Sequence, residues 1–311
     1  MDGLLIVDKP SGPTSHDIVA RARRILRERR IGHTGTLDPL ASGVLPLVVG
    51  RATRLARFLD GDKRYDAVIR LGSNTDTYDV QGQIVGAAFE GTWPERAAIE
   101  HALEPFRGTF LQQPPAFSAK KIAGERSYDI ARRSRGQADG EPAIAPAPVA
   151  VTTRSVDVLG VDGPLVRVRI HCDAGFYVRS LAHDLGASLG TGAHLVELRR
   201  VEACGLRIEQ AVTLEALERM SPEEAAAGLM PMNDMLPGRL PVVLTESGIT
   251  HTRQGRALGP ADSLSGFAEA AQALREGSTD AVRLLDSSGQ LLAMAGAAKS
   301  PGLLHASVVL M

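Results

Sequence analysis

Two segments of this chain alternate between apolar and polar side chains with a period of two residues. In residues 65–71 the apolar set includes Tyr65, Ala67 and Leu71, and in residues 166–172 apolar positions alternate with arginines. Successive side chains of a β-strand point to opposite faces, so the pattern predicts two strands that each bury one face. The chain must therefore contain a sheet with a buried side.

Other segments have the period of an α-helix. Residues 14–17 combine a hydroxyl cap with an acid in the first turn, and an apolar stripe follows in residues 18–26. We expect that helix to end at Gly32. Residues 92–95 resemble a capping box before a second helix, and the stripe in residues 178–189 predicts a third.

The length of the chain bounds its organisation. Its 311 residues exceed what a single core usually serves, so two domains are expected. The irregular stretch 231–241 suggests a larger domain at residues 1–236 and a smaller domain at residues 237–311. A turn pattern at residues 286–289 predicts a hairpin, so the second domain should be rich in β-structure.

Composition excludes several classes of protein. Apolar residues make up 44 %, as in an ordinary globular protein. No stretch approaches the roughly 20 apolar residues of a membrane span, and the first residues lack the pattern of a signal peptide. The two cysteines, Cys172 and Cys204, cannot form a metal cage alone. We therefore expect a cytoplasmic protein without a metal site.

The formal net charge of −1 does not by itself indicate a nucleic-acid partner, but two segments are locally basic. Residues 21–30 contain six arginines and one glutamate. Residues 113–150, rich in proline, alanine and glycine, predict a mobile insertion, and its basic part would bind phosphate. A solvated helix face is the commoner explanation of such charge runs. The candidate RNA-binding residues of the insertion are Lys120, Lys121, Arg126, Arg132 and Arg133.

The glycine-rich segment 32–43 carries the first candidate for chemistry, Asp38. Proline at position 39 biases Asp38 toward an extended backbone, which holds the carboxylate in a defined position. The segment is not a phosphate-binding P-loop, because no Gly-Lys-Ser/Thr follows. The alternative is that Asp38 only caps a turn, the commonest role of Asp beside Pro.

Arg179 and Tyr65 are two further candidates. A cation in the first turn of a helix opposes the helix dipole, so Arg179 should have an acidic partner, for which Asp38 is a candidate. The alternative is a solvent-exposed arginine. Tyr65 follows two cations, which suits stacking on a flipped-out base, although packing at the edge of the core is an equal alternative.

The order of several motifs resembles the bacterial tRNA pseudouridine-55 synthase family over residues 3–235. These motifs are residues 9–17, 32–39, 62–65, 71–72 with 75–77, 175–181, 192–194 and 198–200, together with residues 114–119, which look like the start of that family's tRNA-binding insertion. Phe176 departs from the pattern, since a threonine is usual there.

The resemblance implies a role for each matching residue. Asp38 matches the catalytic aspartate, Arg179 its ion-pair partner, and Tyr65 the tyrosine that stacks on the target base. The other matches are His33, which supports the flipped-out nucleotides, Tyr177 and Leu198, which line the uracil pocket, and Lys9 and Pro10, which support the active site.

The resemblance also implies a fold, an activity and a partner. The fold would be α+β: a bent, mixed, mostly antiparallel sheet with flanking helices, plus a small β-rich, PUA-like RNA-binding domain. The activity would isomerise uridine to pseudouridine at position 55 in the T-loop of tRNA by base flipping. It would need no cofactor, and we expect a monomer that binds the T-arm stem-loop without a membrane or a guide RNA.

Three other functions share some of these features. A non-catalytic RNA-binding protein would tolerate the loss of Asp38. A nucleoside glycosidase would need a second carboxyl group near Asp38 and would release free uracil. A guide-RNA-dependent relative would not need the basic insertion. Within the favoured activity, Asp38 would attack C1′, add to C6 of uracil or remove a ribose proton, and the sequence does not choose among these routes.

Overall fold

The computed structural model describes residues 1–116, 121–122, 125–126 and 146–311. Its largest element is a ten-stranded sheet with the order β14-β1-β3-β12-β4-β11-β10-β7, in which β2 also pairs with β3 and β13 with β12. Only the β1–β14 and β3–β12 pairs of this sheet are parallel. The predicted mixed, mostly antiparallel sheet is therefore confirmed.

The bounds of these strands are β1 (Gly3–Lys9), β2 (Ile31–His33), β3 (Ser42–Val49), β4 (Lys63–Leu71), β7 (Gly108–Gln112), β10 (Val149–Asp162), β11 (Leu165–Cys172), β12 (Ala193–Ala203), β13 (Leu206–Arg207) and β14 (Val212–Thr213). Two-residue strands form two small ribbons, β5 (Asn74–Thr75) with β6 (Ile84–Val85), and β8 (Lys121–Ile122) with β9 (Glu125–Arg126).

The two alternating segments form β11 and β4, which pair with each other as central strands of the sheet. The apolar side chains of both strands are buried in one core cluster. On the opposite face, Arg169 of β11 donates two hydrogen bonds to the Asp66 carboxylate of β4, at 2.7 and 2.9 Å. The period of two in the sequence therefore arises, as predicted, from two strands that each bury one face.

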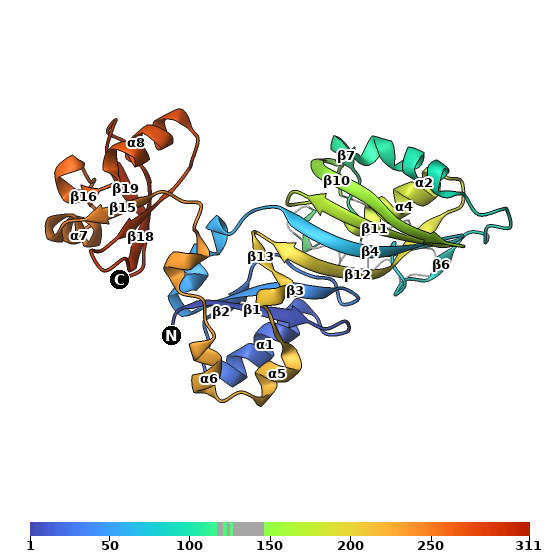
Figure 1. Cartoon of the computed structure of the whole chain (residues 1–311), viewed down its shortest axis with the longest axis horizontal. Helices are drawn as coiled ribbons and strands as arrows, with labels where there is room; N and C mark the ends of the chain where they lie inside the picture. The colour runs from blue at the N-terminus through green and yellow to red at the C-terminus, as the bar shows by residue number, and fades with distance from the viewer. Residues whose placement is uncertain (117–120, 123–124, 127–145) are drawn as a thin grey trace.

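The helices that cover the large sheet are α1 (Ser15–Leu26), α2 (Arg96–Leu103), α4 (Val178–Ser188), α5 (Leu214–Arg219) and α6 (Pro222–Ala227). Figure 1 shows α1, α5 and α6 together beside β1, and α2 with α4 at the other end of the sheet. Four 3-10 helices also occur in this part of the chain: η1 (Gly50–Phe58), η2 (Glu104–Phe106), η3 (Ile208–Gln210) and η4 (Met232–Met235).

The predicted start of α1 is confirmed, whereas its predicted end is wrong. Thr14 Oγ1 accepts a hydrogen bond from the Asp17 amide, and the Asp17 carboxylate accepts one from the Thr14 amide, which completes a capping box. The helix stops at Leu26, and Arg27 takes a left-handed conformation with φ of 50°. Gly32 instead belongs to β2, because pairing with Val48 of β3 satisfies its backbone.

The predicted capping box at residues 92–95 is also wrong. Helix α2 begins at Arg96 after Glu95, and no side chain caps its first turn. Helix α4 begins and ends close to the predicted stripe and has Arg179 in its first turn, as expected.

A second sheet of five strands forms the C-terminal part, in the order β16-β15-β17-β18-β19. Its elements are β15 (Pro241–Leu244), α7 (Glu246–Arg253), η5 (Pro260–Asp262), β16 (Ser263–Ser265), α8 (Phe267–Glu276), β17 (Val282–Leu285), β18 (Leu291–Ala297) and β19 (Leu304–Val309). The predicted hairpin is the β17–β18 pair. The small β-rich C-terminal domain is thus confirmed, and Figure 1 shows it at the left.

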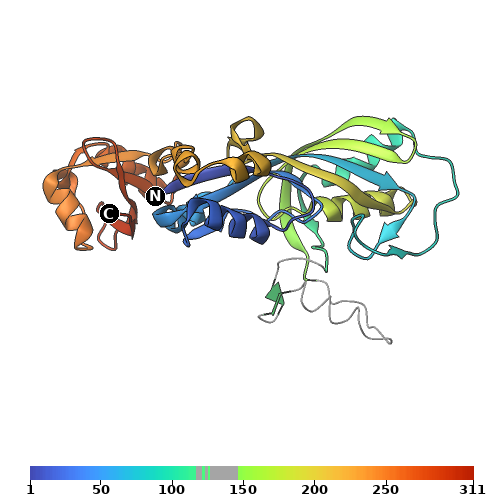
Figure 2. The ribbon, with the colours of Figure 1, turned by 90° about the horizontal axis from the view of Figure 1, so that it is seen from below.

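The two sheets share one buried apolar cluster. It joins side chains of β1 and β3, such as Leu4 and Val48, to Met294, Val308 and Leu310 of the C-terminal part. The N-terminus lies next to the C-terminal sheet in Figure 2. Arg51 also donates a hydrogen bond to the carbonyl oxygen of Leu310. Buried apolar side chains therefore pack together from both sides of the predicted boundary between residues 236 and 237. The boundary itself stays a prediction.

Candidate active site

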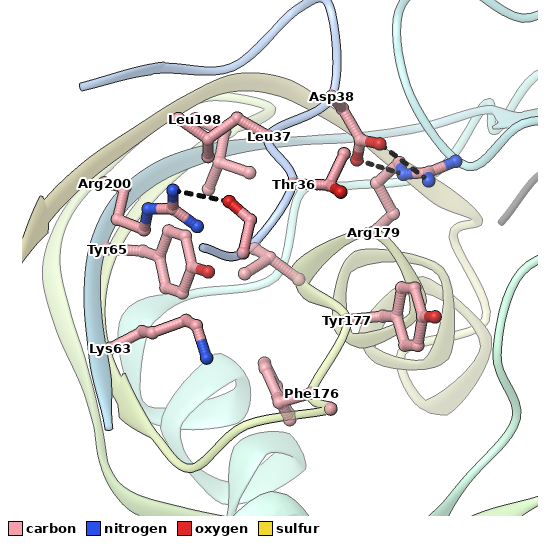
Figure 3. Close-up of a pocket in the computed structure, with 13 residues that line it drawn as sticks. Thr36, Leu37, Asp38, Lys63, Tyr65, Phe176, Tyr177, Arg179, Leu198 and Arg200 are labelled. Atoms are coloured by element: carbon pink, nitrogen blue, oxygen red, sulfur yellow. Dashed lines mark hydrogen bonds and ion pairs between the residues drawn. The ribbon is translucent and has the colours of Figure 1, made fainter. Parts of the chain in front are cut away.

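A pocket of about 280 Å³ opens between the loop after β2, strands β4 and β12, and the start of α4 (Figure 3). The side chains and glycines that line it are Gly35, Thr36, Leu37, Asp38, Lys63, Tyr65, Gly175, Phe176, Tyr177, Val178, Arg179, Leu198 and Arg200. Five of the predicted site residues, Asp38, Tyr65, Tyr177, Arg179 and Leu198, therefore lie around one cavity.

Asp38 and Arg179, which are 141 positions apart in the sequence, form a bidentate ion pair at this pocket. Arg179 Nε donates to Asp38 Oδ2 at 2.8 Å, and Nη2 donates to Oδ1 at 3.2 Å. The Arg179 side chain is 6 % exposed and that of Asp38 35 % exposed. The guanidinium thus lies behind the carboxylate, which keeps access to the pocket.

Arg179 has two further partners in the loop that follows β5. Its Nη1 donates to the Thr77 carbonyl oxygen at 3.1 Å and lies 3.7 Å from Asp79 Oδ2. Asp79 is buried, and its other carboxylate oxygen accepts hydrogen bonds from Thr77 Oγ1 and the Gln81 amide. Two carboxylates therefore compensate a cation placed in the unfavourable first turn of α4, and the solvent-exposed alternative for Arg179 is wrong.

The backbone of the Asp38 loop is held by residues from β1 and the start of α1. The buried Ser15 hydroxyl donates to the Leu37 carbonyl oxygen at 3.0 Å and accepts from the Leu37 amide at 2.9 Å. Leu37 and Leu40 are buried in the core on either side of Asp38. Asp38 does form a turn through its backbone carbonyl, which accepts from the Ala41 amide, but its carboxylate binds Arg179 instead of capping that turn.

Lys9 of β1 holds the same loop through hydrogen bonds to its backbone. Its buried amine donates to the carbonyl oxygens of Ala41 at 2.6 Å, Pro10 at 2.9 Å and Pro39 at 3.4 Å. Burial lowers the pKa of Lys9 to about 8, and the nearby Asp38 carboxylate opposes this shift. Lys9 and Pro10 thus lie beside the loop, where the sequence places them, and neither lines the pocket.

Tyr65 forms one wall of the pocket next to the buried Arg200. The register of β4 and β12 places the two residues opposite each other. Arg200 Nε donates to the Val44 carbonyl oxygen and Nη2 to that of Gly35, at 2.8 and 2.9 Å. Burial raises the pKa of the Tyr65 phenol, and the Arg200 cation opposes part of that rise. Tyr65 is therefore a neutral aromatic surface at neutral pH that also packs in the core.

Gly43 makes the close approach of β3 to β12 possible. It pairs with Arg200 at a φ of +104°, and a Cβ atom there would lie 2.1 Å from the Arg200 carbonyl oxygen. A side chain at this position would push the end of the Asp38 loop away from the pocket.

The opposite wall is the segment that leads into α4. The buried Gln112 side chain accepts from the Tyr177 amide at 2.8 Å and donates to its carbonyl oxygen at 3.0 Å. Phe176 lines the pocket and contacts Phe110 of β7 edge to face, with ring centroids 6.3 Å apart. The two side chains of Gln112 and Phe110 thus fix how Phe176 and Tyr177 face the cavity.

His33 does not line this pocket. Its ring lies edge to face with that of His16, at 5.4 Å between centroids, and its Nδ1 is buried without a hydrogen-bond partner among the described residues. Burial lowers the pKa of His33, and His16 and Arg200 add to the effect. His33 is therefore a neutral imidazole beside the Asp38 loop.

The structure describes the basic run 21–30 completely and the basic insertion only in part. In the run of residues 21–30, Arg21 pairs with Glu218, Arg23 donates to the Ile31 carbonyl oxygen, and Arg30 pairs with Glu28. Part of this run therefore serves the fold. The predicted RNA-binding residues Lys120, Arg132 and Arg133 lie outside the described residues, and Lys121 and Arg126 belong to β8 and β9.

The part of the chain that the structure describes has neither a metal cluster nor a membrane-spanning helix. No group of three or more His, Cys, Asp or Glu side chains there is arranged to hold a metal ion. No helix in those residues is both long and apolar enough to cross a bilayer.

Comparison with known sequences shows which family this chain belongs to. Residues 23–178 match the TruB family pseudouridylate synthase N-terminal domain, and residues 179–237 match the tRNA pseudouridylate synthase B C-terminal domain. The chain belongs to the TruB family of pseudouridylate synthases. It is thus an enzyme, and the resemblance seen in its motifs is confirmed.

The TruB relatives match most of the chain. A tRNA pseudouridine synthase B of Solibacter usitatus is 45 % identical over 82 % of this chain and 85 % of its own length. A second from Synechococcus elongatus is 40 % identical over 99 % of this chain and 98 % of its own. Among solved structures, a chain of a Cbf5-Nop10-Gar1 complex aligns with a TM-score of 0.70 and 25 % identity, covering 99 % of this chain and 85 % of that one.

Three charged residues at this pocket have no role assigned to them in the sequence analysis. Arg200 and Lys63 line the pocket, and Asp79 binds Arg179. The sequence pattern could have indicated Arg200 and Lys63. Arg200 lies two residues after Leu198, and Lys63 lies two residues before Tyr65. Because side chains two apart in a strand share a face, each would lie on the same face as a predicted site residue. Asp79 lies in a loop, where no periodicity indicates the direction of a side chain.

Proposed function

We propose that this enzyme converts uridine to pseudouridine at position 55 in the T-loop of tRNA, with Asp38 as the essential carboxylate. The observation that carries the proposal is the bidentate Asp38–Arg179 pair at the edge of a pocket with Tyr65 on its wall. The guanidinium holds the carboxylate in one orientation through two charge-assisted hydrogen bonds. Each of the three routes open to Asp38 uses a carboxylate.

The dimensions and lining of the pocket suit a single flipped-out base. Leaving the base stack costs a few kcal/mol, which stacking on the neutral Tyr65 ring would offset. Leu198 and Tyr177 would enclose the uracil, and His33 would support the displaced nucleotides. The reaction exchanges one bond to C1′ for another, so the proposal includes no cofactor.

The proposed substrate is a tRNA T-arm recognised without a guide RNA. The relatives named tRNA pseudouridine synthase B, at 40–47 % identity, support tRNA as the substrate. The basic segment within residues 113–150 supports direct binding of the stem-loop. The proposal takes the enzyme as a monomer. A tRNA substrate would place the activity in the cytoplasm.

The glycosidase alternative finds less support in the pocket. Among the described residues, Asp38 is the one carboxylate that lines it, whereas Asp79 is buried behind Arg179. A glycosidase would need a second carboxyl group facing the scissile bond.

Incubation of the purified protein with an unmodified T-arm stem-loop tests the proposal. We expect stoichiometric pseudouridine at the T-loop position in the presence of a chelator and without other RNA or protein. Release of free uracil would support the glycosidase instead, and unchanged uridine would reject both enzymes.

Asp38→Asn provides the matched variant for this assay. The amide keeps the shape of the side chain but removes the charge, so we expect near-normal binding of the stem-loop and no measurable conversion in a single turnover. A variant that keeps a substantial part of the wild-type rate would contradict the role of Asp38. The exposed Asp157→Asn on β10 serves as the control and should be fully active.

A further inference from the structure

Lys63 is a cation of the pocket to which the proposed function gives no role. It precedes Tyr65 by two residues on β4, so both side chains leave the same face of the strand. Both line the pocket. Figure 3 shows the Lys63 amine on the Tyr65 side of the cavity, across from Asp38 and Arg179.

The three cations that line the pocket differ in what they already bind. Arg179 is bonded to Asp38 and Thr77, and Arg200 to the carbonyl oxygens of Val44 and Gly35. Lys63 forms no ion pair with any residue the structure describes, and its hydrogen bond to the Gly61 carbonyl oxygen is long, at 3.4 Å. Its ammonium is therefore available to a group that enters the pocket.

The chemistry of the isomerisation supplies such a group. When the N1–C1′ bond breaks, its electron pair goes to N1 of the base, and the negative charge spreads over the O2 and O4 carbonyl oxygens. The same electrons then form the C5–C1′ bond, C5 loses its proton, and N1 gains one, so atoms and charges balance without another reactant. The detached uracil is thus an anion while it turns over in the pocket.

We propose that Lys63 is a catalytic residue that binds the carbonyl oxygens of uracil and stabilises the detached base. This inference rests on the proposed isomerisation. If the base stacks on Tyr65 with its sugar toward Asp38, the far edge of the ring faces Lys63. A backbone phosphate is the other anion of the substrate, but Lys63 neighbours the buried Tyr65 and Arg200, 7 % and 0 % exposed, which favours the base.

The test compares Lys63→Met and Lys63→Arg with wild type on the T-arm stem-loop. At saturating RNA, we expect the single-turnover rate of Lys63→Met to fall by about 100-fold, as when one preorganised charge-stabilising donor is removed. The dissociation constant should stay close to that of wild type. Lys63→Arg should recover part of the rate, because it restores the charge.

Arg70→Met is the matched control. Arg70 also belongs to β4, but its side chain is exposed on the opposite face of the strand from that of Lys63. Its rate should equal that of wild type.

Three results would overturn the inference. A wild-type rate in Lys63→Met would show that the ammonium takes no part. Weaker binding with a normal saturated rate, and a salt slope lower by about 0.7, would show that Lys63 binds a phosphate. An inactive wild-type enzyme would overturn the proposed function together with this inference, whereas the first two results leave the proposed function intact.

Discussion

At the scale of single residues, Arg179 organises the site because it is shared between two loops. Asp38 comes from the loop after β2, whereas Thr77 and Asp79 come from the loop after β5. A planar guanidinium can bind both loops at once, since its donors point in fixed and different directions. Removal of this side chain should therefore affect the position of the Asp38 carboxylate and of both loops.

We predict that Arg179→Ala lowers the single-turnover rate at neutral pH by roughly 10- to 100-fold. Breaking a buried pair costs roughly 3–5 kcal/mol, and the partial exposure of Asp38 reduces that figure. Without the guanidinium, the Asp38 carboxylate loses both of its charge-assisted hydrogen bonds and is no longer held at the edge of the pocket. Single-turnover rates at saturating T-arm stem-loop would measure the loss.

Two variants complete the Arg179 experiment. Arg179→Lys should restore only part of the rate, since an ammonium cannot form the bidentate pair. Arg96→Ala, which removes an exposed pair with Glu100 on α2, should leave the rate unchanged. A wild-type rate in Arg179→Ala would mean that the position of Asp38 does not depend on this ion pair.

At the scale of elements, the start of α1 has two separable tasks. Thr14 caps the helix, and the adjacent Ser15 binds both backbone groups of Leu37 in the Asp38 loop. Two neighbouring hydroxyl residues can therefore distinguish helix stability from the positioning of the loop.

We predict that Ser15→Ala lowers activity more than Thr14→Ala does. Loss of the buried Ser15 hydroxyl leaves the Leu37 amide without a partner, at a cost of about 1–3 kcal/mol, and loosens the loop that carries Asp38. Thr14→Ala should lower the free energy of unfolding by about 1 kcal/mol while the rate stays normal. Urea unfolding combined with single-turnover rates would measure both effects. Equal rates in the two variants would argue against this division.

The insertion at residues 113–150 is the second element with a separable task. We predict that changing Lys120, Arg132 and Arg133 together to glutamine weakens RNA binding. The slope of log affinity against log salt should flatten by about 0.7 for each single-strand phosphate that the variant no longer neutralises. Arg219→Gln on α5, whose side chain is 75 % exposed and paired with Glu215, is the control. An unchanged slope in the triple variant would indicate that these residues are simply solvated.

At the scale of the whole molecule, the shared apolar cluster couples the two sheets. Its members come from both ends of the chain, from Leu4 to Leu310. Removing a buried residue at one end should therefore destabilise the other. The single tryptophan, Trp93, lies in the catalytic part and reports on the unfolding of that part alone.

We predict that Leu310→Ala shifts the unfolding transition detected by Trp93 fluorescence. Leu310 is 1 % exposed, and truncation of a buried leucine typically costs about 2–5 kcal/mol. Leu264→Ala on β16, at 63 % exposure, should leave the transition in place. If Leu310→Ala produced a separate early transition without moving that of Trp93, residues 237–311 would be an independently folding domain.

Local features of this protein were predictable where a few neighbouring residues determine them. The start of α1 depends on the Thr14–Asp17 capping box, and the strands β4 and β11 follow from a period of two. The β17–β18 hairpin follows from a turn between two apolar runs. Local prediction failed where strand pairing took over, as at Gly32, which pairs in β2 instead of ending α1.

The sequence by itself determined the family, the candidate residues and the chemistry open to Asp38, because ordered motifs and residue types carry that information. Only the tertiary structure decided that Asp38 and Arg179 form a bidentate pair at the edge of a pocket, that Arg200 lies opposite Tyr65, and that Asp79 is a second partner of Arg179. These contacts depend on strand register and on the closure of long loops. No local period of a sequence encodes either, since their free energy comes from burial and pairing between distant segments.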